Sequence, residues 1–196
     1  MNTLFSVAPH LPEGFTYSEH FISEKEEADL LQVISGIELH TFNFQGYEAK
    51  RKVATYGYDW NFTTRKLSKG IAIPVQLKGV IEKVANKFHI PSEDFVEVLI
   101  TEYPPGSVIN WHRDAPPFDL IAGISLLTDC KFRLRPHDKE KQSRNNIKTI
   151  EVKRCSLYTM QGEARSEWQH SITPVKNVRY SITLRTLKIK DEIRQL

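Results

Sequence analysis

Cysteine is scarce in this chain: only Cys130 and Cys155 occur among its 196 residues. Two cysteines are too few for a disulfide framework or a structural zinc site, so we expect a reducing, intracellular compartment. The longest nearly uncharged apolar run, Leu120 to Leu127, is far shorter than the roughly 20 residues of a membrane-spanning helix. The N-terminus lacks a basic segment followed by an apolar one. We therefore expect a cytoplasmic protein with no secretory signal and no membrane contact.

Neither sign of charge dominates, since 27 Lys and Arg residues face 24 Asp and Glu residues. This small excess does not by itself imply a nucleic-acid partner. The cations are nevertheless unevenly distributed, because residues 131–148 contain seven basic and only two acidic side chains. The simplest interpretation of this segment is a solvated loop between two strands.

Length and composition predict one domain over residues 1–196, with enough apolar residues (40%) for a single core and no internal repeat.

Two N-terminal segments show helical patterns. Ser23 and Glu26 fit a capping box at the start of a first helix, which should end near Gly36, where a missing Cβ suits a C-cap. A second helix should begin at Pro74. Its buried face is expected to comprise Leu77, Val80, Ile81, Val84 and Phe88.

From about Phe95 the apolar pattern changes to a period of two, which is typical of β-strands. Short strands preceded by two helices predict an α+β, mainly β fold, most simply a jelly roll with both helices packed on one outer face. Residues 37–70 alternate less regularly and are interpreted as hairpin-like. The expected strands are 96–103, 107–112, 120–127, 130–135, 149–153, 155–160, 170–173 and 178–187.

The strongest chemical signal is the segment Trp111-His112-Arg113-Asp114. Residues two apart on an extended chain point to the same side, so His112 and Asp114 present an imidazole and a carboxylate together. A surface hydrogen bond between the two would explain the pair equally well. His170 follows 56 residues after Asp114 and offers a third ligand. Two histidines and one carboxylate on one face form the facial triad of non-haem Fe(II) oxygenases.

A second signal is the alternation of the segment 179–185, which places Arg179, Ser181, Thr183 and Arg185 on one face. An edge strand with a solvated polar face would show the same pattern. If the face lines a cavity instead, each buried guanidinium needs an anion, and a small dicarboxylate supplies two. Thr101 and Tyr103, two apart on the strand leading to His112, could each add a hydroxyl group.

Four separated motifs now form a recognisable series: Tyr103-Pro-Pro-Gly106, His112-x-Asp114, Trp168-x-His170 and Arg179-Tyr-Ser-x-x-x-Arg185. In this order they resemble the AlkB family of Fe(II)- and 2-oxoglutarate-dependent dioxygenases over roughly residues 50–187. The resemblance implies a double-stranded β-helix. Its core would span about 93–187, preceded by helical support over about 1–92 with a substrate lid near 40–66.

The resemblance also implies the cofactors and their ligands. Iron(II) would be bound by His112, Asp114 and His170, with 2-oxoglutarate and O2 as co-substrates. Arg179 would pair with the distal carboxylate of 2-oxoglutarate, assisted by the Tyr103 hydroxyl, and Arg185 would lie near the carboxylate beside the keto group. Further contacts would come from Thr101 and Ser181, which stand where many members carry Asn. The implied reaction oxidises a substrate C–H bond, commonly of an N-methyl group that is then lost as formaldehyde.

The segment 50–62 resembles the lid that covers a flipped base in nucleic-acid-acting members. Arg51 and its neighbouring lysines suit phosphate contacts, and Tyr56, Tyr58 or Trp60 could stack on the base. The alternative is that these aromatic side chains pack on the jelly roll. Arg165 could reach the mouth of the site, or form a surface salt bridge with Glu163 or Glu167.

These observations favour oxidative demethylation of an alkylated nucleic-acid base, single-stranded or flipped, by a monomeric enzyme. Ala115-Pro116-Pro117 departs from the acidic residues that repair members often carry after the His-x-Asp motif, which weakens the repair interpretation. Three alternatives are an AlkB-like enzyme acting on a protein or small molecule, a binding module without turnover, and a cupin-like enzyme with another metal at His112 and His170.

Overall fold

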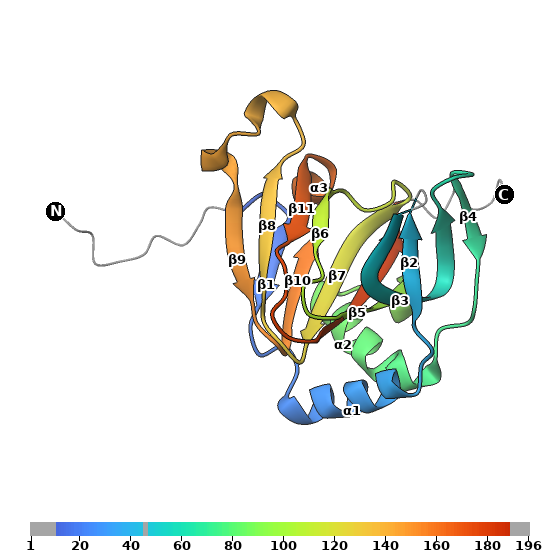
Figure 1. Ribbon diagram of the computed structural model, residues 1–196. Coiled ribbons are helices and arrows are strands. Elements are labelled where there is room, and N and C mark those ends of the chain that lie inside the picture. Colours follow the sequence, from blue (N-terminus) through green and yellow to red (C-terminus); the bar gives the residue numbers. More distant parts are fainter. Residues whose placement is uncertain (1–10, 45–46, 189–196) are drawn as a thin grey trace.

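Two antiparallel sheets face each other in the computed structural model, which describes residues 11–44 and 47–188 (Figure 1). The eight-stranded major sheet has the order β1-β10-β7-β12-β5-β3-β2, with β4 paired to β3. The minor sheet has the order β6-β11-β8-β9. The strands of the major sheet are β1 (Phe15–Ser18), β2 (His40–Phe44), β3 (Tyr47–Asn61), β4 (Lys66–Lys69), β5 (Phe95–Tyr103), β7 (Phe118–Leu126), β10 (Ser156–Met160) and β12 (Arg179–Leu187). Those of the minor sheet are β6 (Ile109–His112), β8 (Cys130–Pro136), β9 (Lys148–Val152) and β11 (Trp168–Ile172).

The predicted jelly roll is confirmed, and all eight expected strands occur with ends within two residues of the prediction. The hairpin-like region 37–70 is also confirmed: β3 pairs with β2, with β4 and with β5, and so joins the major sheet. Apart from the 3-10 turns, two of the described elements carried no sequence signal that we interpreted. They are β1 and the short helix α3 (Gly162–Ser166).

Helix α1 (Glu24–Ser35) begins with the predicted capping box, in which the Glu26 amide donates to Ser23 Oγ at 3.2 Å and the Ser23 amide donates to Glu26 Oε2 at 2.7 Å. Gly36 ends this helix at φ −90°, a conformation open to any residue, so the expected need for a missing Cβ was wrong. Helix α2 (Lys78–Phe88) starts later than predicted, because Pro74 is extended and a 3-10 turn (Val75–Leu77) precedes it. Among the described residues, no helix is long and apolar enough to cross a bilayer.

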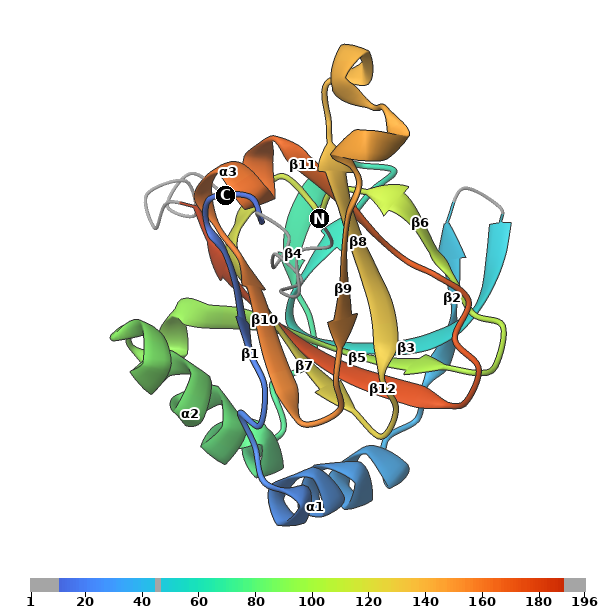
Figure 2. The same cartoon turned by 90° about the vertical axis from the view of Figure 1, so that its left-hand side faces the viewer.

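The major sheet separates two apolar cores. On its outer face, side chains such as Val98 and Ile182 pack against α1 and α2, which lie side by side beneath the sheet (Figures 1 and 2). Between the two sheets, Phe132 and Leu134 of the minor sheet meet Ile121 and Met160 of the major sheet. Both helices therefore cover one outer face, as predicted. The space between the sheets holds the second core and, beside it, the pocket described below.

Glu27 joins α1 to the loops at one end of the major sheet. It is 1% exposed, accepts a hydrogen bond from the Leu127 amide at 2.8 Å, and forms an ion pair with Arg154. Burial alone raises the pKa of Glu27, but the hydrogen bonds from Arg154 and Leu127 outweigh it and leave the pKa below its usual value. The pair therefore stabilises the fold while Glu27 is ionised.

We predict that Arg154→Met lowers the free energy of unfolding at pH 7, since it leaves the buried carboxylate of Glu27 without its cation. The same substitution at the exposed Arg144 is the control. Because the folded-state pKa of Glu27 is lowered, this stability is present above its unfolded-state pKa and is lost as the pH falls through the folded-state value. Urea unfolding of the variant and of the unaltered protein at several pH values measures this difference in stability. An Arg154→Met effect that persists in strong acid would contradict it.

Candidate metal centre and its pocket

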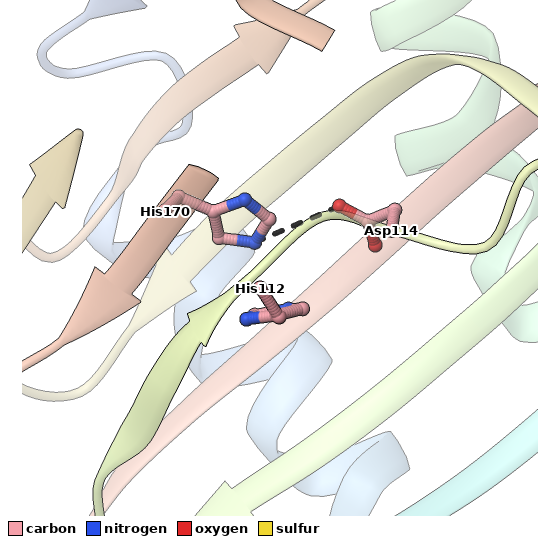
Figure 3. A group of neighbouring side chains, drawn as sticks. All are labelled: His112, Asp114 and His170. Carbon is pink, nitrogen blue, oxygen red and sulfur yellow. Dashed lines mark ion pairs between the residues drawn. The ribbon is translucent and has the colours of Figure 1, made fainter. Parts of the chain in front are cut away.

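The pairing of β6 with β11 brings the two sequence-distant histidines together. His170 is the direct cross-strand partner of His112, and the centroids of their rings lie 4.1 Å apart. Asp114 follows β6 by two residues, and its Oδ2 lies 3.6 Å from His170 Nε2 (Figure 3). One ligand atom from each of the three side chains lies within 4.8 Å of the others. The predicted metal triad is thus assembled between the two sheets.

Neighbouring groups fix the orientation of both rings. His112 Nδ1 donates to the Asn110 carbonyl at 2.9 Å, which leaves Nε2 with a free lone pair. The ring of Phe132 stacks on His170 at 5.4 Å between centroids and 7° between planes. These contacts hold the imidazoles in place before any metal binds.

Electrostatics keep the three side chains in the form that binds a cation. Burial, reinforced by His112, lowers the pKa of His170 to about 3, and burial likewise lowers the pKa of His112. For Asp114, burial raises the pKa, but Arg185 and the two imidazoles outweigh burial and hold it well below its usual value. At neutral pH the site presents two neutral imidazoles and one carboxylate, the donor set that suits Fe(II).

Arg185 determines which oxygen of Asp114 is available. Its guanidinium donates to Asp114 Oδ1 at 2.6 Å and to Glu97 Oε2 at 2.6 Å. The other oxygen, Asp114 Oδ2, is buried and has no hydrogen-bond partner within the part of the chain that the structure describes. It is the oxygen that faces the histidines and can ligate a metal.

Arg179 differs from Arg185 because no carboxylate of the described residues pairs with it. It is fully buried, its Nε donates to Ser125 Oγ at 3.1 Å, and its guanidinium carbon lies 4.8 Å from the centre of the Tyr103 ring. Both terminal nitrogens have no hydrogen-bond partner in residues 11–44 and 47–188. A buried guanidinium without an anion is costly, so the site is suited to the carboxylate of a bound molecule.

The inward-facing side chains of β12 and β5 form matching pairs across the sheet. Arg179 pairs with Tyr103, Ser181 with Thr101, and Arg185 with Glu97. The polar face of β12 therefore lines the interior and is no solvated edge, since β12 lies between β5 and β7. The Tyr103 hydroxyl lies 3.4 Å from Ser181 Oγ. The expectation that one diacid meets both arginines needs correction, because Arg185 already has two carboxylate partners and only Arg179 awaits one.

A pocket of about 520 Å³ opens above the triad. Of the predicted lid residues, Arg51 and Trp60 line it, whereas Tyr56 and Tyr58 do not. Tyr56 packs toward the helices, and Tyr58 lines a separate hollow near Pro74. The prediction for these two tyrosines was wrong because alternate residues of β3 face opposite sides of the sheet.

The alternation of β3 no longer holds beyond Gly57, because the adjacent residues Asp59 and Trp60 both line the pocket. Gly57 has a φ of +82°, and a Cβ there would lie 2.0 Å from the Val96 carbonyl oxygen. Pairing of β3 passes from β5 to β4 at this point, and the hairpin carries Trp60 to the pocket.

Arg165 also lies elsewhere than predicted. It is 6% exposed, and its Nη2 donates to the carbonyls of Asp114 at 3.2 Å and Ala115 at 2.5 Å. It does not line the pocket. Neither Glu163 nor Glu167 forms an ion pair with it among the described residues, so the substrate contact and the surface salt bridge were both wrong. Arg165 instead holds the backbone that follows the metal-binding carboxylate.

Several pocket residues were missed by the sequence analysis, among them Phe42, Glu97 and Trp111. Glu97 shares the alternation of Thr101 and Tyr103, so continuing that period backward along β5 would have found it. No sequence pattern of this kind identified Phe42 or Trp111. Their positions depend on how the edge strands β2 and β6 approach the pocket.

Comparisons with known proteins agree with this geometry. The sequence profile of the 2OG-Fe(II) oxygenase superfamily matches residues 14–185. The chain belongs to this superfamily. It is therefore a dioxygenase that uses Fe(II), 2-oxoglutarate and O2, and the donor set fits them: the triad would hold the iron and Arg179 the distal carboxylate. When bound, they supply oxidation of a C–H bond coupled to decarboxylation of 2-oxoglutarate.

The relatives confirm the resemblance to AlkB proteins. Two are named tRNA (carboxymethyluridine(34)-5-O)-methyltransferase ALKBH8, from Mus musculus (28% identical, covering 85% of this chain and 25% of that protein) and Xenopus tropicalis (26%, covering 87% and 27%). This chain thus spans about a quarter of their length. Among solved structures, OsALKBH1 matches with a TM-score of 0.67 at 14% identity, covering 90% of this chain and 98% of that one. A Trichoplax adhaerens prolyl hydroxylase matches at 0.63 and 14%, covering 93% and 87%, which shows the shared fold.

For the oxygenase site we predict that Asp114→Asn lowers the affinity for Mn(II), a stand-in for Fe(II), by about 100-fold or more, because loss of a direct ligand exceeds the 10- to 100-fold typical of outer-sphere changes. Asp119→Asn removes an exposed carboxylate on β7 and should leave the Mn(II) affinity unchanged. Titration calorimetry on the folded variants measures both. Unchanged Mn(II) affinity in Asp114→Asn would remove the carboxylate from the ligand set.

We further predict that Arg179→Met raises the KM for 2-oxoglutarate about 10- to 100-fold, the usual size of a lost charge-assisted hydrogen bond. The same variant should be no less stable than the unaltered protein without ligand, because an unpaired buried charge is removed. Succinate production in the absence of other substrate, together with thermal unfolding, tests both halves. An unaltered KM would show that the diacid binds elsewhere.

Proposed function

We propose that this dioxygenase oxidises an N-alkyl group on a base of single-stranded nucleic acid. The observation that carries the proposal is the composition of the pocket mouth. There the Arg51 guanidinium carbon lies 4.0 Å from the centre of the Phe42 ring, with Lys50, Trp60 and Trp111 also on the lining. Aromatic faces suit the stacking of an extruded base, and cations suit its flanking phosphates.

The size and depth of the pocket support the same substrate. A volume of about 520 Å³ accommodates the co-substrate and a flat heterocycle, and the triad lies on its wall, so a small substituent on the base can approach the metal. Ala115, directly after Asp114, is buried and offers no acidic side chain to the base. We therefore propose an unpaired strand, with no requirement for recognition of a duplex.

The names of the relatives agree with a nucleic-acid substrate. ALKBH8 is named for methyl transfer to a tRNA uridine. Because this chain spans about a quarter of that protein, methyl transfer is not part of the proposal. Prolyl hydroxylases share the fold at 14% identity, which carries no argument about substrate, and oxidation of a protein is kept as an outcome of the test.

Two neighbouring cations of β3 allow a matched experiment. Arg51 lines the pocket, whereas Lys52 lies on the other side of the strand, where its Nζ is 3.6 Å from Glu102 Oε1. We predict that Arg51→Glu weakens binding of single-stranded RNA and DNA about tenfold or more and lowers the salt dependence, while Lys52→Glu has a much smaller effect.

The decisive assay is a panel of single-stranded oligonucleotides, each with one N-methylated base, incubated with Fe(II), 2-oxoglutarate and O2. We expect at least one to yield formaldehyde and succinate in equal amounts. The proposal is contradicted if no oligonucleotide does so while a peptide or free small molecule stimulates succinate formation. Equal effects of the Arg51→Glu and Lys52→Glu substitutions would contradict the assigned pocket mouth.

A further inference from the structure

The outer face of the minor sheet carries a row of cations that the oxygenase site does not use. Along β8, Phe132 and Leu134 point into the core, with 0% and 1% exposure. The alternate residues Arg133 and Arg135 therefore point outward. Figure 2 views the molecule from the side on which β8 and β9 lie. This row belongs to the basic segment 131–148, whose role the sequence did not reveal.

Both arginines are gathered around one tryptophan. The guanidinium carbons of Arg133 and Arg135 lie 4.8 Å and 4.6 Å from the centre of the Trp111 ring. Arg133 Nε donates to Ser171 Oγ at 3.0 Å, and Arg135 Nε donates to Gln169 Oε1 at 2.8 Å. Each side chain is thus fixed through its Nε. We name Trp111, Arg133 and Arg135 the Trp111 cluster.

The Trp111 cluster concentrates positive charge without an acidic partner. Within the described part of the chain, neither guanidinium forms an ion pair with a carboxylate. Burial and the nearby charge of Arg133 lower the pKa of Arg135, as expected where like charges are held together. Two fixed, unpaired guanidiniums are an arrangement that an anion would stabilise.

The cluster adjoins the pocket. Trp111 is part of the pocket lining and precedes the metal-binding His112. Arg113 also lines the pocket and donates to the Ser166 carbonyl at 2.5 Å. A chain leaving the pocket on this side would pass over Trp111 onto β8.

We propose that the Trp111 cluster binds the phosphodiester backbone of the single-stranded nucleic acid whose target base occupies the pocket. The inference rests on the proposed function and adds a second contact site, on the opposite sheet from Arg51. Alternate side chains of a strand stand roughly 6.7 Å apart, comparable to successive phosphates of an extended strand. The paired nitrogens of each guanidinium match phosphate oxygens, and Trp111 offers a ring to an adjacent base.

The test compares binding of a fluorescent single-stranded RNA dodecamer by the unaltered protein and by the Arg133→Gln/Arg135→Gln double variant between 0.1 and 1 M salt. Each lost phosphate contact lowers the salt slope by about 0.7, so two lower it by about 1.4 and weaken binding about 25-fold at 0.1 M. Arg133→Lys/Arg135→Lys keeps the charge and should keep most of the slope. If the glutamine variant does not fold, the lysine variant still tests the proposal, because it should lose affinity through the missing guanidinium geometry.

Lys25→Gln/Lys87→Gln provides the matched control, because these exposed lysines lie on α1 and α2, across the major sheet from the cluster. Thermal unfolding confirms that each variant is folded. If the unaltered protein binds no single-stranded nucleic acid, the proposed function fails and this inference fails with it. If Arg51→Glu weakens binding but the glutamine variant binds with unchanged affinity and slope, only the Trp111 cluster is overturned. Equally effective competition by polyglutamate, charge for charge, would assign the face to acidic polypeptides and also overturn it.

Discussion

The buried cation of Arg185 connects the two halves of the site. From β12 in the major sheet it donates both to Glu97 on the neighbouring β5 and to Asp114, which follows β6 of the minor sheet. Both carboxylates are nearly inaccessible to water, so their charges require a nearby cation. The buried guanidinium of Arg185 requires their negative charge for the same reason. This bridge directs one oxygen of Asp114 toward the histidines. It also ties the metal-binding carboxylate to the sheet that would bind the co-substrate.

The two sheets have different tasks. The minor sheet supplies both histidines through one register, His170 opposite His112, and Phe132 holds one of the rings. The major sheet supplies the buried Arg179, whose terminal nitrogens have no hydrogen-bond partner among the described residues. Metal binding and diacid binding are therefore prepared on facing surfaces. The pocket between them is also lined by aromatic rings and cations, among them Trp60, Trp111 and Arg51.

Local patterns predicted the parts of this structure that depend on local geometry. A period of two located the strands of the core and placed Arg179 and Arg185 on one face, and the capping box located α1. The meeting of His112 with His170 depends on strand register, which their separation of 58 residues does not specify. The facial-triad pattern suggested His170, and the resemblance to known motifs supported it. The tyrosines of β3 were misplaced because the composition of a segment does not say which side faces a pocket. Arg165 was misplaced because its backbone acceptors lie some 50 residues away.

A crystal structure with Mn(II) and a non-decarboxylating analogue of 2-oxoglutarate tests the central claim most directly. The account predicts one metal ion bound by His112, Asp114 Oδ2 and His170, with the remote carboxylate of the analogue on the terminal nitrogens of Arg179. A metal bound without His170, or a remote carboxylate that leaves Arg179 without an anion, would contradict it.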